Sequence, residues 1–342
     1  MNAPISRTPR VGVVLSGEGM PINELVDYAV GLEDAGFDSV WHEEIFRDPF
    51  VPLAAIAERT SRLTLGTSVS TWVRTPVASA LISANLDELS DGRYIHGVGT
   101  GPPAWNEQFH GIPYHQPVAR MREYVGAIRT AWAGHSDRVV DYDGEHYSID
   151  GYSRPIIQAR EQIPLYLAAV RKNMLRLAGS IADGVIFNVL TTPAYYREYG
   201  LRYLTDGALQ AGRQVGDVHK AALVCVAVDS DEAQARQWAR HQIAFFAQIP
   251  YFEVILSPHD LWKPAEAIRK AALTGDVRAM VGAVTDEMVD KLAVAGTPDR
   301  CRERLKDWCD LDIALLLAPS YQLPQEEISA NYRAIAAAFA TA

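Results

Sequence analysis

Hydrophobic and polar positions along the chain follow two alternating periods. Short runs rich in β-branched and other apolar residues recur along the sequence, and between them apolar residues lie three or four positions apart, as at Leu25, Ala29 and Leu32. The first pattern predicts buried strands and the second predicts amphipathic helices. The eight predicted strands are Val11–Leu15, Phe37–Trp41, Leu63–Thr67, Tyr94–Val98, Pro164–Ala168, Val185–Asn188, Ala221–Val228 and Ile313–Leu317.

The helices predicted between these strands have start and stop signals. Pro76 opens one helix, and Asp91-Gly92 turns the chain into the strand that follows it. Strands that alternate with helices indicate a parallel sheet, and eight such units favour closure into a (β/α)8 TIM barrel over an open doubly wound sheet. The predicted helices are Ile22–Ala35, Pro52–Arg59, Pro76–Leu89, Pro117–Trp132, Asn173–Ala182, Pro193–Ala211 and Gln325–Ala340.

Two segments depart from the alternation and are interpreted as insertions. Residues 138–149 are predicted to form a hairpin, because two short β-rich runs flank Asp143-Gly144, a favoured hairpin turn. Residues 231–295 are predicted to be a helical insertion after the seventh strand. No linker divides the chain, so residues 1–342 are interpreted as one domain.

A glycine-rich turn follows the fourth strand. Gly99-Thr100-Gly101 leads directly into Pro102-Pro103, and no helical pattern is predicted immediately behind it. Glycines let the backbone take positive φ or approach a ligand closely. The reactive groups of barrel enzymes lie at the carboxyl ends of the strands, so we expect a cofactor to lie against this turn.

Composition and charge narrow the classes of function. Hydrophobic residues make up 48% of the chain, enough for a globular core, and a formal net charge of −10 argues against a broad nucleic-acid surface. Cys225, Cys301 and Cys309 have neither metal-ligand spacing nor an even disulfide pattern. The polar residues 1–10 lack the apolar core of a signal peptide, and no apolar stretch of about 18 residues follows. These features predict a cytoplasmic protein without membrane association.

The residues that follow the predicted strands favour cofactor binding. His42, Glu43 and Glu44 follow the second strand, but the other strand ends offer mostly Ser, Thr and Asn, so no metal site is predicted. Ser68 and Ser70 lack a partner group that would mark an activated nucleophile. Small residues, hydroxyls and backbone N–H groups suit a flat cofactor with a phosphate tail.

The turn Ala168–Lys172 is the candidate for the phosphate. It leads from the fifth strand into a helix, whose first N–H groups lack intrahelical partners. These groups, with Arg171 and Lys172, are suited to receive an anion. Alternatively, Arg171 and Lys172 are solvent-exposed residues of the first helical turn that bind no ligand. Both interpretations stay open.

Motifs in a fixed order resemble the bacterial luciferase-like flavin monooxygenase superfamily. They are Leu63–Val69, Leu86–Arg93, Gly97–Gly101 with Trp105–Glu107, Ile163–Ala169, Ala182–Gly184 and Ala295–Pro298, and they span nearly the whole chain. Within the superfamily the chain is most similar to the branch that uses coenzyme F420, a 5-deazaflavin, and there to the methylenetetrahydromethanopterin reductase group. The resemblance implies a barrel with a deazaflavin or flavin at its carboxyl face, and commonly a homodimer.

The resemblance also assigns cofactor-binding residues by position. Ser68-Val69 matches a non-proline cis peptide that forms a bulge supporting the deazaflavin ring. The other positions are Gly99, Thr100, Gly101 and Asn106 near the ring, Ala168, Ala169 and Val170 in the phosphate turn, and Asn188 at the next strand end.

Two carboxylates are the catalytic candidates. Glu44 is expected to donate a proton or to hydrogen-bond the cofactor ring, with a helix cap or a surface position as the alternative. Glu107 is the second candidate. Glu44→Gln is accordingly expected to lower turnover with little loss of folding.

Aromatic residues are candidates for the walls of the substrate pocket. Trp72 and Trp105 flank the glycine-rich turn, although either could equally belong to the core. Pro250–Phe252 and Trp262 lie in the helical insertion, where a subunit contact or the core of the insertion would explain them as well.

The chain departs from the sugar-phosphate dehydrogenases of the family at two places. Ile45 stands where those relatives have a catalytic histidine, and Pro102-Pro103 replaces their acidic residue. The leading hypothesis is therefore a coenzyme F420-dependent oxidoreductase that passes a hydride to a different small organic substrate. The alternatives are an FMN-dependent monooxygenase and a flavin-binding relative without catalysis.

Overall fold

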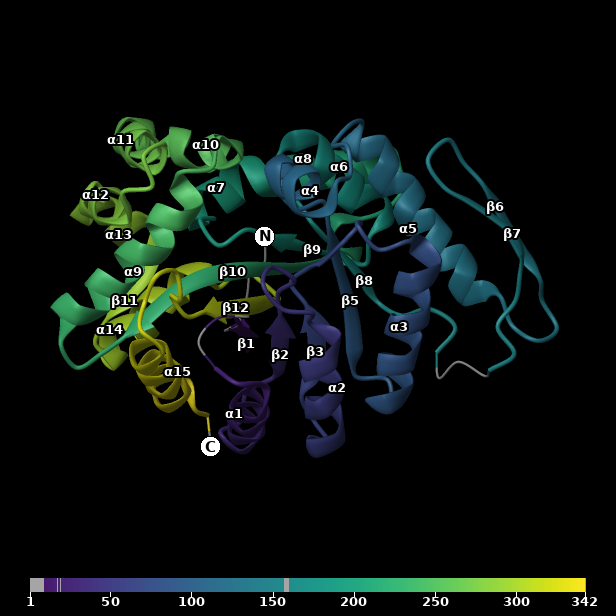
Figure 1. Cartoon of the computed structure of the whole chain (residues 1–342), viewed down its shortest axis with the longest axis horizontal. Helices are drawn as coiled ribbons and strands as arrows, with labels where there is room; N and C mark the ends of the chain where they lie inside the picture. The colour runs from purple at the N-terminus through teal and green to yellow at the C-terminus, as the bar shows by residue number, and fades with distance from the viewer. Residues whose placement is uncertain (1–8, 17, 19, 157–159, 342) are drawn as a thin grey trace, which may run out of the picture.

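The apolar runs predicted as strands pair edge to edge into a closed parallel barrel (Figure 1). The computed structural model describes residues 9–16, 18, 20–156 and 160–341, so residues 1–8 of the predicted polar N-terminus lie outside the described part. The barrel strands, in spatial order, are β1 (Arg10–Leu15), β2 (Ser39–His42), β3 (Thr64–Thr67), β5 (Tyr94–Gly99), β8 (Leu165–Ala168), β9 (Gly184–Phe187), β10 (His219–Val228) and β12 (Ile313–Leu317).

Pairing of the first strand with the last closes the barrel. β1 lies between β2 and β12, with Val13 opposite Val40 on one side and Leu316 on the other. All three side chains are fully buried. Strands covered on both faces have nearly continuous apolar sequences, which is why short apolar runs predicted them.

Helices surround the barrel, as predicted. Thr75 caps the helix that begins at Pro76, and its hydroxyl accepts a hydrogen bond from Ala78 N at 3.3 Å. The surrounding helices are α1 (Ile22–Asp34), α2 (Phe50–Arg59), α3 (Pro76–Leu89), α5 (Pro117–Ala133), α6 (Lys172–Ile181), α7 (Pro193–Tyr195), which continues through the π turn η1 (Tyr196–Gly200) into α8 (Leu201–Gln210), α14 (Pro298–Leu305) and α15 (Gln325–Phe339).

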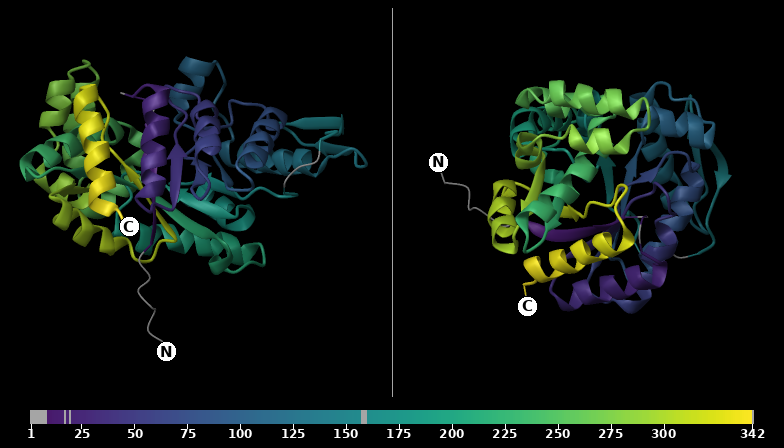
Figure 2. Two further views of the ribbon diagram at one scale, coloured as in Figure 1. Left: turned by 90° about the horizontal axis from the view of Figure 1, so that it is seen from below. Right: turned by 60° about the vertical axis from the view of Figure 1, so that its left-hand side comes forward.

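A two-stranded hairpin stands beside the barrel. β6 (Val140–Asp143) and β7 (Ser148–Tyr152) pair antiparallel and have no partner in the barrel sheet. The hairpin lies next to α5 at one end of the molecule in both views (Figures 1 and 2). It ends a few residues beyond the stretch 138–149 predicted from the Asp-Gly turn.

The expectation that no helix directly follows the glycine-rich turn is wrong. Helix α4 (Pro103–His110) begins two residues after Gly101 and ends at Gly111, whose φ is +66°. Asn106 is the only buried residue of this helix. Without an apolar stripe, α4 has no periodicity that would predict it.

The segment 231–295, predicted to be helical, ends in a strand. β11 (Ala293–Gly296) pairs in parallel with the second half of β10, where Cys225 lies opposite Ala293. The rest of the segment is helical as predicted, and includes the 3₁₀ turns η3 (Pro250–Phe252) and η4 (Ser257–His259). Its helices are α9 (Glu232–Ala247), α10 (Glu253–Leu256), α11 (Trp262–Ala272), α12 (Val277–Gly282) and α13 (Asp286–Leu292).

The insertion and α4 lie near the end of the barrel toward which the strands point (Figure 1). This arrangement places their side chains close to the carboxyl ends of β2, β3, β5, β8 and β9. None of the helices in the described part of the chain combines the length and apolar character needed to cross a membrane.

Candidate functional site

A pocket opens at the carboxyl ends of the barrel strands and encloses about 150 Å³. Residues that follow five strands contribute to it, together with α4 and the insertion. Its lining includes ten of the predicted site residues: Glu44, Ser68, Val69, Gly99, Thr100, Gly101, Ala168, Ala169, Val170 and Asn188. The fold therefore gathers positions that lie up to 144 residues apart in the sequence (188 − 44). Their contact with a cofactor stays a prediction.

The peptide bond between Ser68 and Val69 is cis, as the resemblance predicted. Backbone hydrogen bonds fix this segment against the end of β2: Ser68 N donates to His42 O at 2.9 Å, and Glu44 N donates to Val69 O at 3.3 Å. Both Ser68 and Val69 line the pocket. The bulge is thus held by the neighbouring strand end.

Glycine is required at two places in the turn behind this bulge. A Cβ at Gly99 would lie 2.6 Å from Cγ2 of Val69 and 3.2 Å from Cβ of Ala168. Gly101 has a φ of +64°, a conformation that favours glycine. The two glycines let the turn pack directly against Val69 and then change direction into α4.

Asn106 holds the turn from behind. Its Nδ2 donates to Thr100 O at 2.7 Å and to Pro102 O at 3.0 Å, while its Oδ1 accepts from Trp72 Nε1 at 2.5 Å. Asn106 and Trp72 are buried outside the pocket lining, whereas Trp105 lines the pocket. The structure therefore places Asn106, a predicted cofactor-binding residue, where it positions the turn.

Asn106→Leu is expected to lower the free energy of unfolding by about 2–3 kcal/mol, because the Trp72 indole N–H and two carbonyl groups would lose their buried partner. Urea denaturation followed by tryptophan fluorescence measures the change. Gln108→Leu, on the exposed side of the same helix, is the matched control and should change stability by less than about 0.5 kcal/mol. Equal stabilities of the two variants would contradict this role.

Both carboxylate oxygens of Glu44 accept hydrogen bonds from the protein. Oε2 accepts from Thr71 N at 2.7 Å, Thr71 Oγ1 at 3.1 Å and Ser70 Oγ at 3.4 Å. Oε1 accepts from Arg74 Nε at 2.8 Å and from Arg74 Nη2, which also contacts Asp48. Glu44 therefore fixes the short strand β4 (Ser70–Thr71). Its catalytic role stays a prediction.

Glu107, the second catalytic candidate, is not brought to the pocket. It lies on the exposed side of α4 and is absent from the pocket lining. Its Oε1 accepts a hydrogen bond from Tyr114 N at 3.4 Å. The geometry gives Glu107 a local contact with the loop after α4 and no route to the strand ends.

The candidate phosphate turn uses some of its donors internally. Ala169 N donates to Ile186 O at 3.1 Å, and Lys172 N donates to a tyrosine hydroxyl at 3.2 Å. The guanidinium of Arg171 lies 4.9 Å from the ring centre of Tyr251, and its Nε donates to Tyr251 O at 3.3 Å. Arg171 thus joins this turn to the insertion while remaining exposed.

The pocket has the chemistry that a flavin or deazaflavin ring requires. Ser68 Oγ is buried and has no hydrogen-bond partner among the residues that the structure describes. A ring carbonyl or ring nitrogen would satisfy it. Val69, Ile186 and Leu223 supply apolar surface for a flat ring. The residues present therefore fit such a ring, with Ser68 as a polar contact.

Several pocket residues were not singled out from the sequence as site residues. Glu43 lines the pocket beside Glu44, although the sequence had suggested it only as a metal ligand. Burial and the nearby Glu18 raise the pKa of Glu43 to about 8. The pair of consecutive carboxylates at a strand end was the feature of the sequence that could have indicated Glu43 as a site residue. Leu223 and Phe246 also line the pocket and gave no signal beyond their apolar character.

The insertion contributes an aromatic wall. Tyr251 and Phe252 line the pocket, in agreement with one of the three interpretations of that segment. Trp262 lies elsewhere, on α11. Through the contact of Tyr251 with Arg171, the wall adjoins the turn that follows β8.

His42 is buried behind the pocket lining. Its Nδ1 lies 2.8 Å from Glu43 O, and burial lowers the pKa of its imidazole to about 4. A neutral ring hydrogen-bonded to the strand end supports the structural role considered for this residue.

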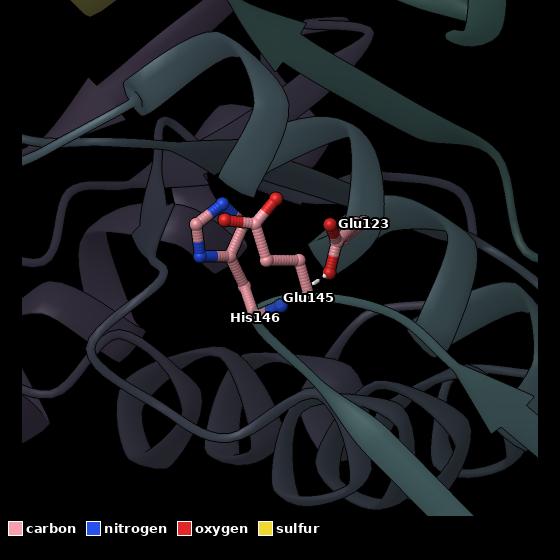
Figure 3. A group of neighbouring side chains, drawn as sticks. All are labelled: Glu123, Glu145 and His146. Carbon is pink, nitrogen blue, oxygen red and sulfur yellow. Dashed lines mark hydrogen bonds between the residues drawn. The ribbon is translucent and has the colours of Figure 1, made fainter.

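One group outside the pocket has the composition of a metal site. Figure 3 shows Glu123 on α5 beside Glu145 and His146 at the tip of the β6–β7 hairpin, with candidate ligand atoms within 4.8 Å of one another. Glu123 Oε2 already accepts hydrogen bonds from His146 N at 2.7 Å and Tyr147 N at 3.3 Å. Glu123 therefore anchors the hairpin tip. The prediction that the pocket holds no metal stays a prediction.

Named relatives match the chain over nearly its whole length. A 5,10-methylenetetrahydromethanopterin reductase from Methanolobus tindarius is 33% identical over 313 residues, which cover 90% of this chain and 93% of the relative. An F420-dependent glucose-6-phosphate dehydrogenase from Nakamurella multipartita is 29% identical over 346 residues, which cover 94% of each chain.

Solved structures share the fold. The coenzyme F420-dependent tetrahydromethanopterin reductase from Methanopyrus kandleri superposes with a TM-score of 0.78 at 24% identity, covering 95% of this chain and 98% of that one. An F420-dependent secondary alcohol dehydrogenase in complex with an F420-acetone adduct gives a TM-score of 0.75 at 19% identity, covering 97% and 99%. The family model described as luciferase-like monooxygenase matches residues 1–314, and the chain therefore belongs to that family.

Proposed function

We propose that this protein is a coenzyme F420-dependent oxidoreductase that transfers a hydride between the deazaflavin and a small organic substrate. The observation that carries the proposal is the pocket, in which the Ser68-Val69 bulge, the Gly99–Gly101 turn and the Ala168–Val170 turn face one cavity. A 29% identical relative and two solved structures with the same fold are named as F420-dependent proteins. These names support the choice of cofactor.

The protein would supply binding, orientation and shielding from water, while the deazaflavin, when bound, supplies the hydride-transfer chemistry. Ser68 and Val69 would hold the ring from one side, with the Gly99–Gly101 turn packed behind them. Trp105 and Phe252 would cover the opening and keep water from the reacting atoms. Fixing both reactants in this way lowers the entropy cost of their encounter.

The lining favours an uncharged, largely apolar substrate. Ile45 and Pro102 both face the pocket, at the positions where the chain departs from sugar-phosphate dehydrogenases. Leu223, Phe246 and Phe252 extend this apolar surface. We therefore propose a small carbonyl or imine compound as the substrate class. A homodimer is a further part of the proposal.

Cofactor binding tests the proposal directly. Calorimetry on the purified protein should show F420 binding at least about tenfold more tightly than FMN. Bleaching of the visible absorbance of F420 in the presence of a small alcohol, or its return when F420H2 meets a ketone or imine, would demonstrate hydride transfer. Failure of F420 to bind would contradict the proposal.

The second candidate is an FMN-dependent monooxygenase, which the description of the matched family favours. Tighter binding of FMN, with oxygen consumption by the reduced complex, would select it. Binding of either cofactor without turnover on a broad substrate panel would select the third alternative, a flavin-binding relative without catalysis.

A further inference from the structure

The pocket contains two adjacent carboxyl groups in opposite environments. Glu44 accepts hydrogen bonds on both oxygens and is paired with Arg74. Glu43 also lines the pocket, but no ion pair connects it to a cation within the described residues. Of two carboxyl groups in such different environments, the one without a cationic partner is better suited to carry a proton.

The surroundings of Glu43 disfavour a negative charge. Glu43 also borders a smaller hollow lined by Glu18, Gln242, Ser320 and Tyr321. Burial is the larger cause, and the nearby carboxylate of Glu18 adds to it. Phe245 and Phe246 form the apolar side of the same hollow.

The polar groups around Glu43 are largely bonded to one another. Ser16 Oγ donates to Ser320 Oγ at 3.1 Å, and Ser320 N donates to Gln242 Oε1 at 3.0 Å. Ser16 N donates to the hydroxyl of Tyr332 at 2.8 Å, and that hydroxyl donates to a β1 carbonyl. The Ser16 side chain, through a hydrogen bond, favours the ionised form of Glu43.

Burial keeps two tyrosines and two histidines on the elements around Glu43 uncharged around neutral pH. Burial raises the pKa values of Tyr321 and Tyr332. Burial also lowers the pKa values of His42 and His241, so neither histidine supplies a positive charge. Burial and the like charge of Glu18 together favour the acid form of Glu43, against the hydrogen bond from Ser16.

We propose that Glu43 is the general acid of this site, which gives its proton to the substrate heteroatom as the substrate carbon receives the hydride. This inference rests on the proposed function. It adds a residue whose environment distinguishes it from Glu44, the candidate that the sequence indicated first.

In this step the substrate is reduced at a C=O or C=N double bond. The π bond of a substrate C=O or C=N group breaks, a new C–H bond forms with the hydride, and the electron pair moves to the heteroatom. The O–H bond of Glu43 breaks as its proton joins that heteroatom. The Glu43 carboxylate would then recover a proton from water, and the deazaflavin, when bound, would release one proton to water as it supplies the hydride. The substrate is reduced by two electrons and the cofactor is oxidised by two.

Infrared spectroscopy of the protein without cofactor tests the protonation state by itself. The carbonyl band of a protonated carboxyl group should be present at about pH 7, disappear with a midpoint near pH 8, and be missing from Glu43→Gln. Glu18→Gln should move the midpoint to lower pH. Glu58→Gln, which removes an exposed carboxylate on α2, should leave the band unchanged. An identical spectrum for wild type and Glu43→Gln would overturn the proposal.

Steady-state kinetics of Glu43 variants test its role as the general acid. Glu43→Gln should lower kcat by about 10²–10⁴-fold while F420 affinity stays within about twofold, and Glu43→Asp should recover part of the loss. Wild-type kcat should fall as pH rises through the midpoint of the infrared band. If the wild-type protein binds F420 and catalyses hydride transfer, but Glu43→Gln keeps the wild-type kcat, the general-acid role of Glu43 is contradicted while the proposed function stands. If F420 does not bind the wild-type protein, the proposed function fails and this role fails with it.

Discussion

Arg74→Met is expected to lower the free energy of unfolding by about 3 kcal/mol. Arg74 donates two hydrogen bonds to Glu44 and also contacts Asp48, and its side chain is only 26% exposed while that of Glu44 is 16% exposed. Removal of one member of such a pair leaves a carboxylate with little water and no counterion. Methionine keeps much of the side-chain volume, so the loss reports mainly on charge and hydrogen bonding.

A surface ion pair provides the matched control. Arg59 and Asp27 are paired at 2.5 Å, but their side chains are 51% and 66% exposed. Arg59→Met should therefore change stability by less than about 1 kcal/mol. Urea denaturation of both variants gives the comparison. Similar losses for the two variants would show that the Arg74 pair stabilises the protein no more than a surface contact.

The same network changes the expectation for Glu44→Gln. From its place after a strand, the sequence predicted lower turnover with little loss of folding. The structure shows donors from Ser70, Thr71 and Arg74 around this carboxylate. We therefore expect Glu44→Gln to destabilise the protein as well, so turnover measurements on this variant need a stability measurement beside them.

Glu43→Gln is expected to stabilise the folded protein in alkaline solution by about 2–4 kcal/mol. In the folded protein the pKa of Glu43 is raised from its ordinary 4.5 to about 8. Between these values the folded state holds a proton that the unfolded state has lost, so wild-type stability falls as pH rises through this window. Glutamine cannot ionise and avoids that loss. The lower end of the range allows for partial solvent access to the half-buried side chain.

The pH dependence separates this effect from a general change in packing. Unfolding free energies of wild type and Glu43→Gln should nearly coincide below about pH 4.5 and diverge up to about pH 8, with a constant difference above it. Glu58→Gln should run parallel to wild type throughout. Parallel curves for Glu43→Gln would show that Glu43 ionises normally in the folded protein.

The predictions for Arg74→Met and Glu43→Gln both concern the two consecutive glutamates after β2, which have different contacts. Glu44 fixes β4 through Thr71 and Arg74, and Glu43 faces the pocket and the hollow beside it. The proposed reaction needs a rigid pocket and a proton source. Glu44 would contribute to the rigidity of the pocket, and Glu43 would supply the proton.

The sequence by itself determined the barrel and most of its elements. Apolar runs predicted all eight barrel strands, and the signals Pro76 and Asp91-Gly92 set the bounds of α3 and the start of β5 within a residue or two. The ordered motifs predicted the cis Ser68-Val69 bond and indicated that the site lies at the strand ends. These features are local, because strand and helix periods and turn residues act within a few positions of the chain.

Only the tertiary structure decided the features that depend on distant partners. Helix α4 lacks an apolar stripe and is held through Asn106, whose contact Trp72 lies 34 residues away. β11 becomes a strand by pairing with β10. Glu43 and Glu44 are chemically identical neighbours, and Arg74, 30 residues from Glu44, separates their roles. Burial and donor partners come from the packing of strands and helices far apart in the chain, so no local pattern could distinguish the two carboxylates.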